Sequence, residues 1–381
     1  MDSKTMVQQY SDQPIYIEHN DTLAKYCQQW AQCELLALDT EFIRTDTFYP
    51  KGALLQISDG VDCFLIDPLA IDEFAPLVAI LTDPTIVKVV HSCSEDLEVF
   101  ECLFGVVPRP LIDTQIAAGM DGHGFSLGYQ AMTQALLDIH VEKGETRSNW
   151  LQRPLTASQI HYAALDVAYL PAMYHLLVAS LTAKGRLEWL LEECQALIEI
   201  EPDEQKITEY YKKVKSAWKL SARELTFLQR LTQWRERQAR DRNIPRGRVL
   251  KDCCCFDLAR LRPAVASDLD RVKELPGQFV RRYGDVVMAI VEQAAKVSAE
   301  DCVQCLPKPL PPESNSLMKK LKAHVHSRAE QLQLAPEVLA RKKDYEALLR
   351  AGRDGYQLPP SLSGWRKHVI GDELLALAMG Q

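Results

Sequence analysis

A short apolar run that ends in two acidic residues limits the fold of this chain more than any other feature. Leu35–Leu38 is predicted to be a buried strand, and Asp39 and Glu41 stand at its end. Positions i and i+2 of a strand face the same side, so both carboxylates can reach one site. Two buried like charges are costly unless a cation neutralises them. The run therefore predicts a strand that carries a site for a hard divalent ion, Mg²⁺ or Mn²⁺.

The residues around this strand indicate a mixed α/β fold. Four further segments are expected to be strands: Ala53–Ser58, Val61–Ile66, Ile86–Val90 and Leu111–Asp113. Asp59-Gly60 is a strong hairpin turn signal between the first two of them. Helices are expected between the later strands and from Thr114 to about Ile200. This order implies a mixed sheet covered by helices. No Gly-rich turn follows the first strand, so a Rossmann fold is not implied.

The second half of the chain is helical in pattern, and proline-containing loops interrupt it. The densest interruption is Leu306–Pro312, which has the composition of an inter-domain linker. Ser221 and Glu224 form a capping box that should start the main helix of this half. We expect three domains, spanning residues 1–204, 205–300 and 301–381.

Formal charge changes sign between the two halves. Residues 1–200 carry −17 and residues 201–381 carry +9, which together account for the net charge of −8. The excess is sharpest in residues 211–250, where twelve Lys and Arg residues stand against three acidic ones. Such asymmetry suggests a polyanionic partner for the second half. From charge alone, a helix surface that is solvated and binds no partner is an equally good explanation.

Three more positions offer groups suited to an ion site. Asp96 opens the helix expected after the fourth strand, although an acidic residue in a first helical turn also simply compensates the helix dipole. Tyr162 and Asp166 are four apart and share one face of a predicted helix. Taken alone, that pair is more simply explained as a surface tyrosine on an amphipathic helix. Asp113 is expected to cap a helix rather than to bind an ion.

Taken together, these residues resemble the three ordered motifs of the DEDDy family of 3′→5′ exonucleases. The motifs are the DxE pair at Asp39 and Glu41, the segment centred on Asp96, and Tyr-x-x-x-Asp at Tyr162 and Asp166. The stretches LDTEF, HSCSEDLEVF, LIDTQIA and HYAALDVAYL are similar to the ribonuclease D branch of that family, and the helical half resembles HRDC domains. The resemblance implies an RNase H-like α/β exonuclease domain followed by two all-α HRDC-like domains.

The resemblance also implies a reaction. Asp39, Glu41, Asp96 and Asp166 would bind two divalent ions, Mg²⁺ or Mn²⁺, and Tyr162 would orient the attacking water. The expected activity is hydrolysis of RNA from an accessible 3′ end, as in tRNA precursors, with release of 5′-mononucleotides. A DNA-directed 3′→5′ exonuclease is one alternative. A non-catalytic nucleic-acid-binding protein is another, and the intact set of five residues argues against it.

Contacts to the substrate are also expected. Residues near the terminal nucleotides would be Phe42, Gln56, Leu127, Trp150 and Arg153. Trp150 would stack on a base, with anchoring of its loop in the core as an equal alternative. Contacts to the RNA backbone would come from basic residues of the helical half: Lys212, Lys213, Lys215, Lys219, Arg235 and Arg237.

Composition sets the remaining expectations. No run of 18 or more apolar residues occurs, so no membrane span is expected. The segment Met1–Tyr10 lacks the apolar centre of a signal peptide, which predicts a cytoplasmic protein. Most of the eleven cysteines should be free thiols, because a reducing compartment is expected. Neither Cys302/Cys305 nor Cys253–Cys255 has a clear partner pair for a zinc site. No obligate protein partner is evident.

Overall fold

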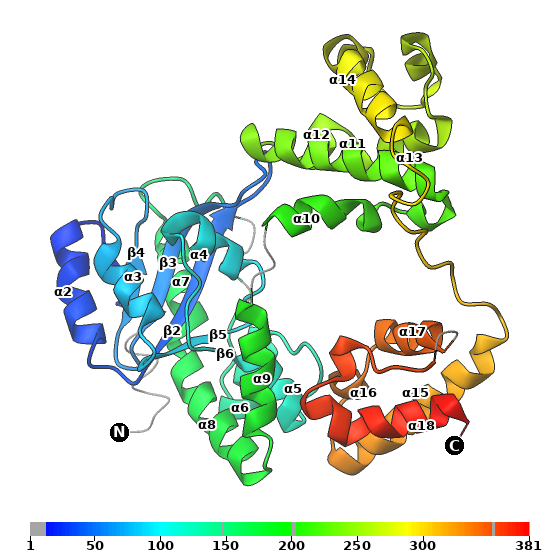
Figure 1. Cartoon of the computed structure of the whole chain (residues 1–381). Coiled ribbons are helices and arrows are strands. Elements are labelled where there is room, and N and C mark those ends of the chain that lie inside the picture. Colours follow the sequence, from blue (N-terminus) through cyan, green and yellow to red (C-terminus); the bar gives the residue numbers. More distant parts are fainter. Residues whose placement is uncertain (1–12, 143, 146–147, 200–202, 353–354, 381) are drawn as a thin grey trace. The chain divides into compact units, whose positions relative to one another are not determined.

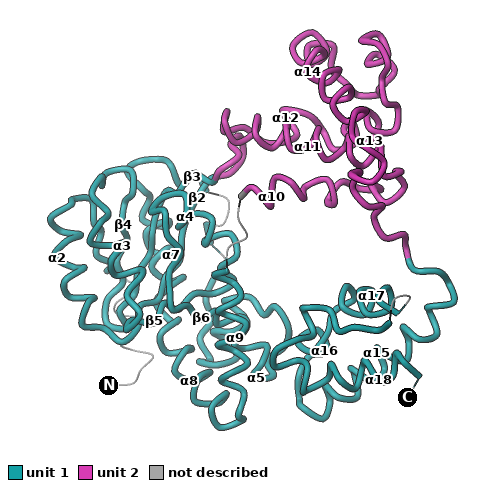
Figure 2. Tube along the Cα trace, in the orientation of Figure 1, with its two compact units in different colours: residues 1–43, 50–199, 310–381 teal, residues 44–49, 200–309 magenta. Residues whose placement is uncertain are grey.

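The computed structural model describes residues 13–142, 144–145, 148–199, 203–352 and 355–380 (Figure 1). They form two compact units, each assembled from segments that are distant in sequence (Figure 2). Unit 1 comprises residues 1–43, 50–199 and 310–381, and unit 2 comprises residues 44–49 and 200–309. The segment Met1–Tyr10 lies outside the described residues.

Unit 1 contains a six-stranded mixed sheet in the order β1-β4-β3-β2-β5-β6. The strands are β1 (Ile15–Ile17), β2 (Leu35–Ile43), β3 (Lys51–Ser58), β4 (Cys63–Ile66), β5 (Val87–Val90) and β6 (Leu111–Asp113). Strand β2 pairs antiparallel with β3 and parallel with β5. The predicted mixed sheet is confirmed, and the edge strand β1 was not predicted. Strand β4 starts later than expected, because the Asp59 side chain accepts hydrogen bonds from Val61 N and Asp62 N and closes a longer turn.

Helices cover both faces of the sheet. In the α/β part of unit 1 they are α2 (Asn20–Trp30), α3 (Ala75–Thr82), α4 (Asp96–Phe104), α5 (Thr114–Asp121), α6 (Tyr129–Leu137), α7 (Ala157–Ala168), α8 (Leu170–Ala183) and α9 (Leu187–Ile198). Leu36 and Leu38 of β2 pack in one core with α2, α3 and α4. Leu35 and Ala37 face the other way, into a core shared with α5 to α9. Asp113 caps α5 as predicted, accepting a hydrogen bond from Gln115 N.

The stretch Ala157–Ala183, which spans α7 and α8, is long and apolar enough to cross a membrane by length and composition alone. Half of its most apolar window is buried inside the protein. The core helices of soluble proteins pass the same test, so this stretch is only weak support for a membrane span.

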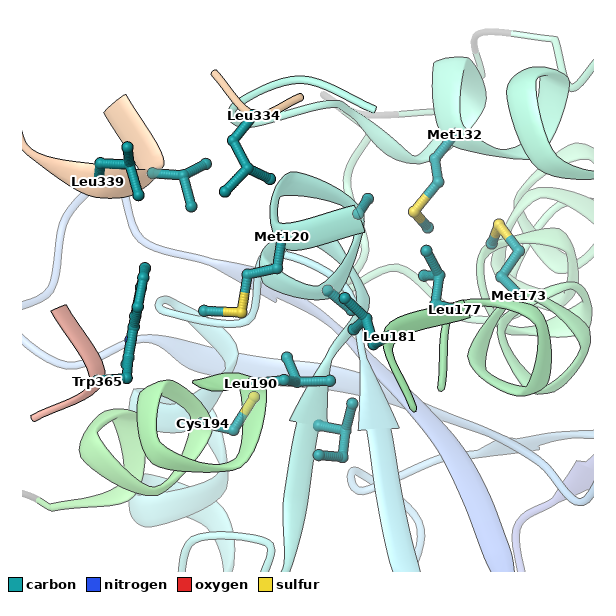
Figure 3. Close-up of a cluster of buried hydrophobic side chains, with 14 of the residues drawn as sticks. Met120, Met132, Met173, Leu177, Leu181, Leu190, Cys194, Leu334, Leu339 and Trp365 are labelled. Carbon is teal, nitrogen blue, oxygen red and sulfur yellow. The ribbon is translucent and has the colours of Figure 1, made fainter. Parts of the chain in front are cut away.

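The last part of the chain packs within unit 1. It folds into α15 (Ser314–Leu332), α16 (Pro336–Leu339), α17 (Lys342–Ala351), a 3-10 turn (Pro360–Leu362), a π-helical turn (Lys367–Gly371) and α18 (Asp372–Met379). Its residues Leu334, Leu339 and Trp365 share one buried cluster with Met120 and Leu190 of the α/β part (Figure 3). These C-terminal helices are therefore part of the compact unit that contains the sheet.

Unit 2 is helical. Its elements are α10 (Asp203–Glu209), two 3-10 turns (Tyr210–Lys213 and Ala217–Lys219), α11 (Ala222–Asp241), α12 (Arg246–Val249), α13 (Asp252–Leu261), a third 3-10 turn (Ala266–Arg271) and α14 (Gly277–Ala295). The predicted capping box of Ser221 and Glu224 is confirmed at the start of α11. Leu228 and Leu231 of α11 pack in the core of this unit with Leu258 and Val287.

The connection between β2 and β3 also belongs to unit 2. Phe48 is buried with Ala239 and Val249, and the guanidinium groups of Arg240 and Arg246 lie 4.9 and 4.5 Å from the centre of its ring. The backbone N–H groups of Phe48 and Tyr49 both donate to Asn243 Oδ1 at 3.0 Å. The segment Arg44–Tyr49 therefore packs as a part of unit 2.

Candidate active site

Strand β2 carries the first two acidic residues of the site. Asp39 lies opposite Gln56 and Glu41 opposite Leu54 in the antiparallel pairing with β3. Both carboxylates share the face of Leu35 and Ala37, because alternate residues of a strand point the same way. A β-bulge follows directly after Glu41. The strand therefore presents two carboxylates toward the helices that cover this face.

Helix α4 brings a third carboxylate. Asp96 is its first residue, and the hydroxyl of Thr40, between the two acidic residues of β2, donates a hydrogen bond to Asp96 Oδ1. Burial raises the pKa of Asp96 to about 6, against the lowering effect of the Thr40 hydrogen bond. Thr40 thus links α4 directly to the strand that carries Asp39 and Glu41.

Helix α7 supplies the last two groups. It begins at a capping box formed by Thr156 and Gln159. The Tyr162 hydroxyl donates a hydrogen bond to the Asp166 carboxylate one turn later. Gly144 approaches the Tyr162 ring so closely that a Cβ there would lie 2.4 Å from Cδ2. The tyrosine is therefore held between its own helix and the backbone of the preceding loop.

Burial and neighbouring carboxylates raise the pKa of three of the four acidic residues. Burial, Asp96, Asp166 and Glu41, in that order, place the pKa of Asp39 well above its ordinary value. Burial, then Asp166 and Asp96, raise the pKa of Glu41 to about 9. Burial raises the pKa of Asp166 to about 7, in spite of the Tyr162 hydrogen bond and with a further increase from Asp96. Residues from β2, α4 and α7 therefore form one electrostatic cluster.

This cluster has the donor chemistry of a divalent cation site. Carboxylate oxygens are the ligands that Mg²⁺ and Mn²⁺ prefer, and a cation would offset the mutual repulsion. As placed, no group of three or more acidic, His or Cys side chains in the described part of the chain is close enough to ligate an ion. The four carboxylates lie within electrostatic range but are not arranged as ligands, and Thr40 and Tyr162 hold two of them through hydrogen bonds.

The structure places two of the five expected nucleotide contacts, Gln56 and Trp150, in the protein interior. Trp150 is 2% exposed and packs with Leu54, Leu65 and Ala163. This placement favours the anchoring role of Trp150 over stacking on a base. Gln56 is fully buried. Phe42 and Leu127 are half-buried.

Arg153 is bound by the protein itself. Its Nε and Nη2 donate to the two carboxylate oxygens of Asp67 at 2.5 and 2.7 Å. Further hydrogen bonds run from its guanidinium group to the carbonyl oxygens of Trp150, Gln152 and Ala53. The paired groups lower the pKa of Asp67. As placed, Arg153 fixes the loop before α7 rather than facing a phosphate.

The basic residues of unit 2 differ in their exposure. Lys212, Lys213, Lys215 and Lys219 are exposed. Lys212 pairs with Glu209, and Arg237 pairs with Glu204. Arg235 is only 1% exposed and donates to the Leu250 carbonyl and the Asp252 carboxylate. As placed, it cannot meet an RNA backbone. A sign of this was available in the sequence, because Arg235 follows Leu228 and Leu231 at helical spacing.

Several residues that shape the site were not predicted from the sequence. Thr40 lies between the motif residues Asp39 and Glu41, and this position could have identified it from the sequence. Asp67, which follows β4, gave no local indication that it would bind Arg153. The Tyr129 hydroxyl donates to the Leu165 carbonyl at 2.5 Å, and Asp166 contributes to raising the pKa of Tyr129. These contacts join segments that are far apart in sequence.

The chain is similar to proteins of known family over nearly its whole length. A 3′–5′ exonuclease family model matches residues 14–182, an HRDC domain model matches residues 224–291, and the ribonuclease D C-terminal HRDC domain matches residues 312–374. Ribonuclease D of Pseudomonas paraeruginosa is 44% identical over 94% of this chain and 96% of that protein. Ribonuclease D of Escherichia coli is 35% identical over 94% of this chain and 96% of its own length.

A solved structure extends the similarity to the fold. The crystal structure of Escherichia coli RNase D, described as an exoribonuclease involved in structured RNA processing, superposes with a TM-score of 0.88 at 34% identity. The superposition covers 97% of this chain and 99% of that one. Exonuclease domains of this family depend on divalent metal ions. The chain therefore belongs to the ribonuclease D family and is a 3′→5′ exoribonuclease, a hydrolase of phosphodiester bonds.

Proposed function

We propose that this chain removes nucleotides from the accessible 3′ end of RNA, releases them as 5′-mononucleotides, and does so with two divalent ions, Mg²⁺ or Mn²⁺. The observation that carries the proposal is the half-buried cluster of Asp39, Glu41, Asp96 and Asp166, in which burial and acidic neighbours raise the pKa of Asp39, Glu41 and Asp166. These four residues would hold the ions. Ions bound there would activate a water and stabilise the leaving 3′ oxygen.

Tyr162 orients the attacking water in this proposal. Its hydroxyl already donates to Asp166 on the same helix face. Burial, followed by Asp166, Glu41 and Asp39, raises the pKa of Tyr162 well above its ordinary value. The phenol therefore stays protonated at neutral pH and serves as a hydrogen-bond donor rather than as a base. The contact with Gly144 limits the movement of its ring.

The substrate would be held by residues near its terminal nucleotide and by basic residues that contact its backbone. Phe42 and Leu127 are half-buried and lie on or near the elements that carry the carboxylates, and we assign them to the region of the terminal nucleotide. Gln56 is fully buried in β3 and is given no nucleotide contact. Trp150 and Arg153 would keep the preceding loop in place. Exposed basic residues of unit 2 would hold the RNA backbone through salt-dependent contacts: Lys212, Lys213, Lys215, Lys219 and Arg237.

The proposed substrates are structured RNAs with single-stranded 3′ ends, such as tRNA precursors. Support comes from the description of the Escherichia coli relative as an enzyme of structured RNA processing. A single-stranded end suits this site, because a duplex must fray before its last phosphodiester can reach the carboxylates. We also propose a cytoplasmic location, the domain boundaries at residues 204/205 and 300/301, and action without an obligate protein partner.

Digestion of matched RNA and DNA oligonucleotides tests the proposal. Each oligonucleotide would be labelled at its 5′ end in one sample and at its 3′ end in another, and incubated with Mg²⁺, Mn²⁺ or EDTA. We expect RNA labelled at the 5′ end to shorten one nucleotide at a time, and the 3′ label to appear at once as a mononucleotide. EDTA should stop both. Equal digestion of DNA would contradict RNA preference, and release of the 5′ label first would contradict the direction.

A further inference from the structure

The side chain of Gln56 is fully buried in the middle of β3, and its amide is unpaired. Among the described residues, neither its Nε2 nor its Oε1 has a hydrogen-bond partner. The indole Nε1 of Trp150 is also buried and also has no partner within that part of the chain. Buried polar atoms are paired in nearly all native proteins, because an unpaired one costs free energy. Unpaired atoms on two side chains in one region suggest that these atoms form hydrogen bonds in the active protein.

The strand register places Gln56 between Trp150 and Asp39. Gln56 is the direct partner of Asp39 on one side and of Leu65 on the other. Directly paired residues of an antiparallel sheet have Cβ atoms about 4.5–5.5 Å apart on the same face. Trp150 packs against Leu54 and Leu65, which flank Gln56 on that face. The amide therefore has the Asp39 carboxylate on one side and the indole on the other.

The indole, the amide and the carboxylate can form a chain of two hydrogen bonds. An indole Nε1–H only donates, a Gln side chain both accepts and donates, and an ionised carboxylate only accepts. The indole of Trp150 can therefore donate to Oε1 of Gln56, and Nε2 of Gln56 can donate to Asp39. This sequence would satisfy every unpaired atom of the two buried side chains.

We propose that Gln56 is a positioning residue for Asp39, oriented in turn by the Trp150 indole, and that it fixes the carboxylate in the orientation that binds a divalent ion. The inference rests on the proposed function in one respect, namely that Asp39 holds an ion. Hydrogen-bond partners of metal ligands orient those ligands, and their loss typically weakens metal binding about 10- to 100-fold. Full burial of Gln56 makes this role a better fit than direct contact with a nucleotide.

Calorimetric titration of the metal-free, full-length protein with Mn²⁺ tests the inference without depending on activity. The variant Gln56→Met keeps the length of the side chain and removes both polar atoms. We expect its Kd for Mn²⁺ to rise about 10- to 100-fold. Trp150→Phe keeps an aromatic ring and removes the indole N–H, so it should raise the Kd in the same direction by a smaller factor. Thermal unfolding in EDTA would check that each variant is folded.

Two control variants separate the possible results. Ser58→Ala changes another buried polar residue on the same face of β3, whose hydroxyl accepts from Gly60 N, and it should leave the Kd unchanged. Asp39→Asn should weaken binding strongly. If it does so while Gln56→Met and Trp150→Phe bind like the wild type, the role of Gln56 is refuted. If Asp39→Asn binds like the wild type, the ion site itself is refuted. Should Gln56→Met fail to fold, an unchanged Kd in Trp150→Phe would overturn the inference.

Discussion

Trp189 of α9 and Trp365 of the C-terminal helices stack face to face, with ring centroids 4.4 Å apart and planes inclined by 10°. Polar contacts surround the stack. The backbone N–H of Trp365 donates to Glu192, and the guanidinium group of Arg366 pairs with Glu193. The helix that follows the nuclease fold and the last helical domain are therefore parts of one packed structure.

The variant Trp365→Ala should destabilise unit 1. Trp365 is buried in the cluster of Figure 3, and loss of a buried Trp side chain typically costs about 3–5 kcal/mol. Urea unfolding followed by circular dichroism would measure the change. Leu176→Ala, at an exposed position of α8, serves as the control and should change stability by less than about 0.5 kcal/mol. Equal stability of the two variants would show that the stack does not hold the domain.

Surface substitutions in unit 2 should change the salt dependence of RNA binding. Replacing Lys213, Lys215 and Lys219 by Ala should lower the slope of log K against log[salt] by about 2, because each single-stranded phosphate contact contributes about 0.7. Substitutions suit this test better than removal of residues 205–381, since that deletion would also expose the core beneath Trp365.

A buried arginine provides the control for this test. Arg235→Met should lower the stability of unit 2 and leave the salt slope unchanged, because Arg235 is not exposed to RNA. Filter binding of a 3′-tailed RNA at several salt concentrations would measure the slopes. An unchanged slope in the triple Lys variant would remove these residues from the RNA contact.

The variant Asp166→Asn should stabilise the metal-free protein, and more so at high pH. The pKa of Asp166 is raised to about 7 by burial first and by Asp96, so the folded state binds its proton more tightly than the unfolded chain does. Stability is then lost as the pH rises from the unfolded pKa, near 4, through about 7. Each pKa unit corresponds to about 1.4 kcal/mol, so the gain should reach a few kcal/mol at most.

Melting temperatures in EDTA at pH 5 and pH 8 would measure this effect. The difference between Asp166→Asn and the wild type should be small at pH 5 and larger at pH 8. Asn can still accept the Tyr162 hydrogen bond, so the substitution mainly removes charge. A difference that shrinks as the pH rises would contradict the raised pKa.

Asn243→Ala should release the segment Arg44–Tyr49 within unit 2. The Asn243 side chain accepts from the backbone N–H groups of Phe48 and Tyr49, and its φ of 46° is strained for Ala. Loss of both hydrogen bonds should speed hydrogen exchange of these two amides at least about tenfold. Asn243→Asp keeps an acceptor oxygen and should protect them nearly as well as the wild type. Similar exchange in Asn243→Ala and the wild type would argue against this anchor.

The sequence predicted those parts of the molecule that depend on local pattern. The run Leu35–Leu38 with its two acidic residues indicated β2, and the capping box at Ser221 indicated the start of α11. Strand β1 was missed because it has only three residues and pairs at the edge of the sheet.

The features that the sequence did not predict depend on contacts between residues that are far apart in the chain. Arg153 is engaged by Asp67, which lies 86 residues earlier in the chain. The burial of Trp150 depends on β3, β4 and α7. No local pattern contains these contacts, so the sequence could not distinguish a substrate-facing side chain from an anchoring one. The packing of the C-terminal helices against α9 is of the same kind.

We propose above that the acidic cluster carries out metal-dependent hydrolysis from the 3′ end. The most direct measurement compares the wild type with Asp39→Asn on a 5′-labelled RNA in Mg²⁺, with RNA binding measured in parallel. We expect the variant to lose the ladder of shortened products, with a rate at least about 100-fold lower, while its affinity for RNA stays near that of the wild type. A variant that binds RNA and retains most of the wild-type rate would contradict it.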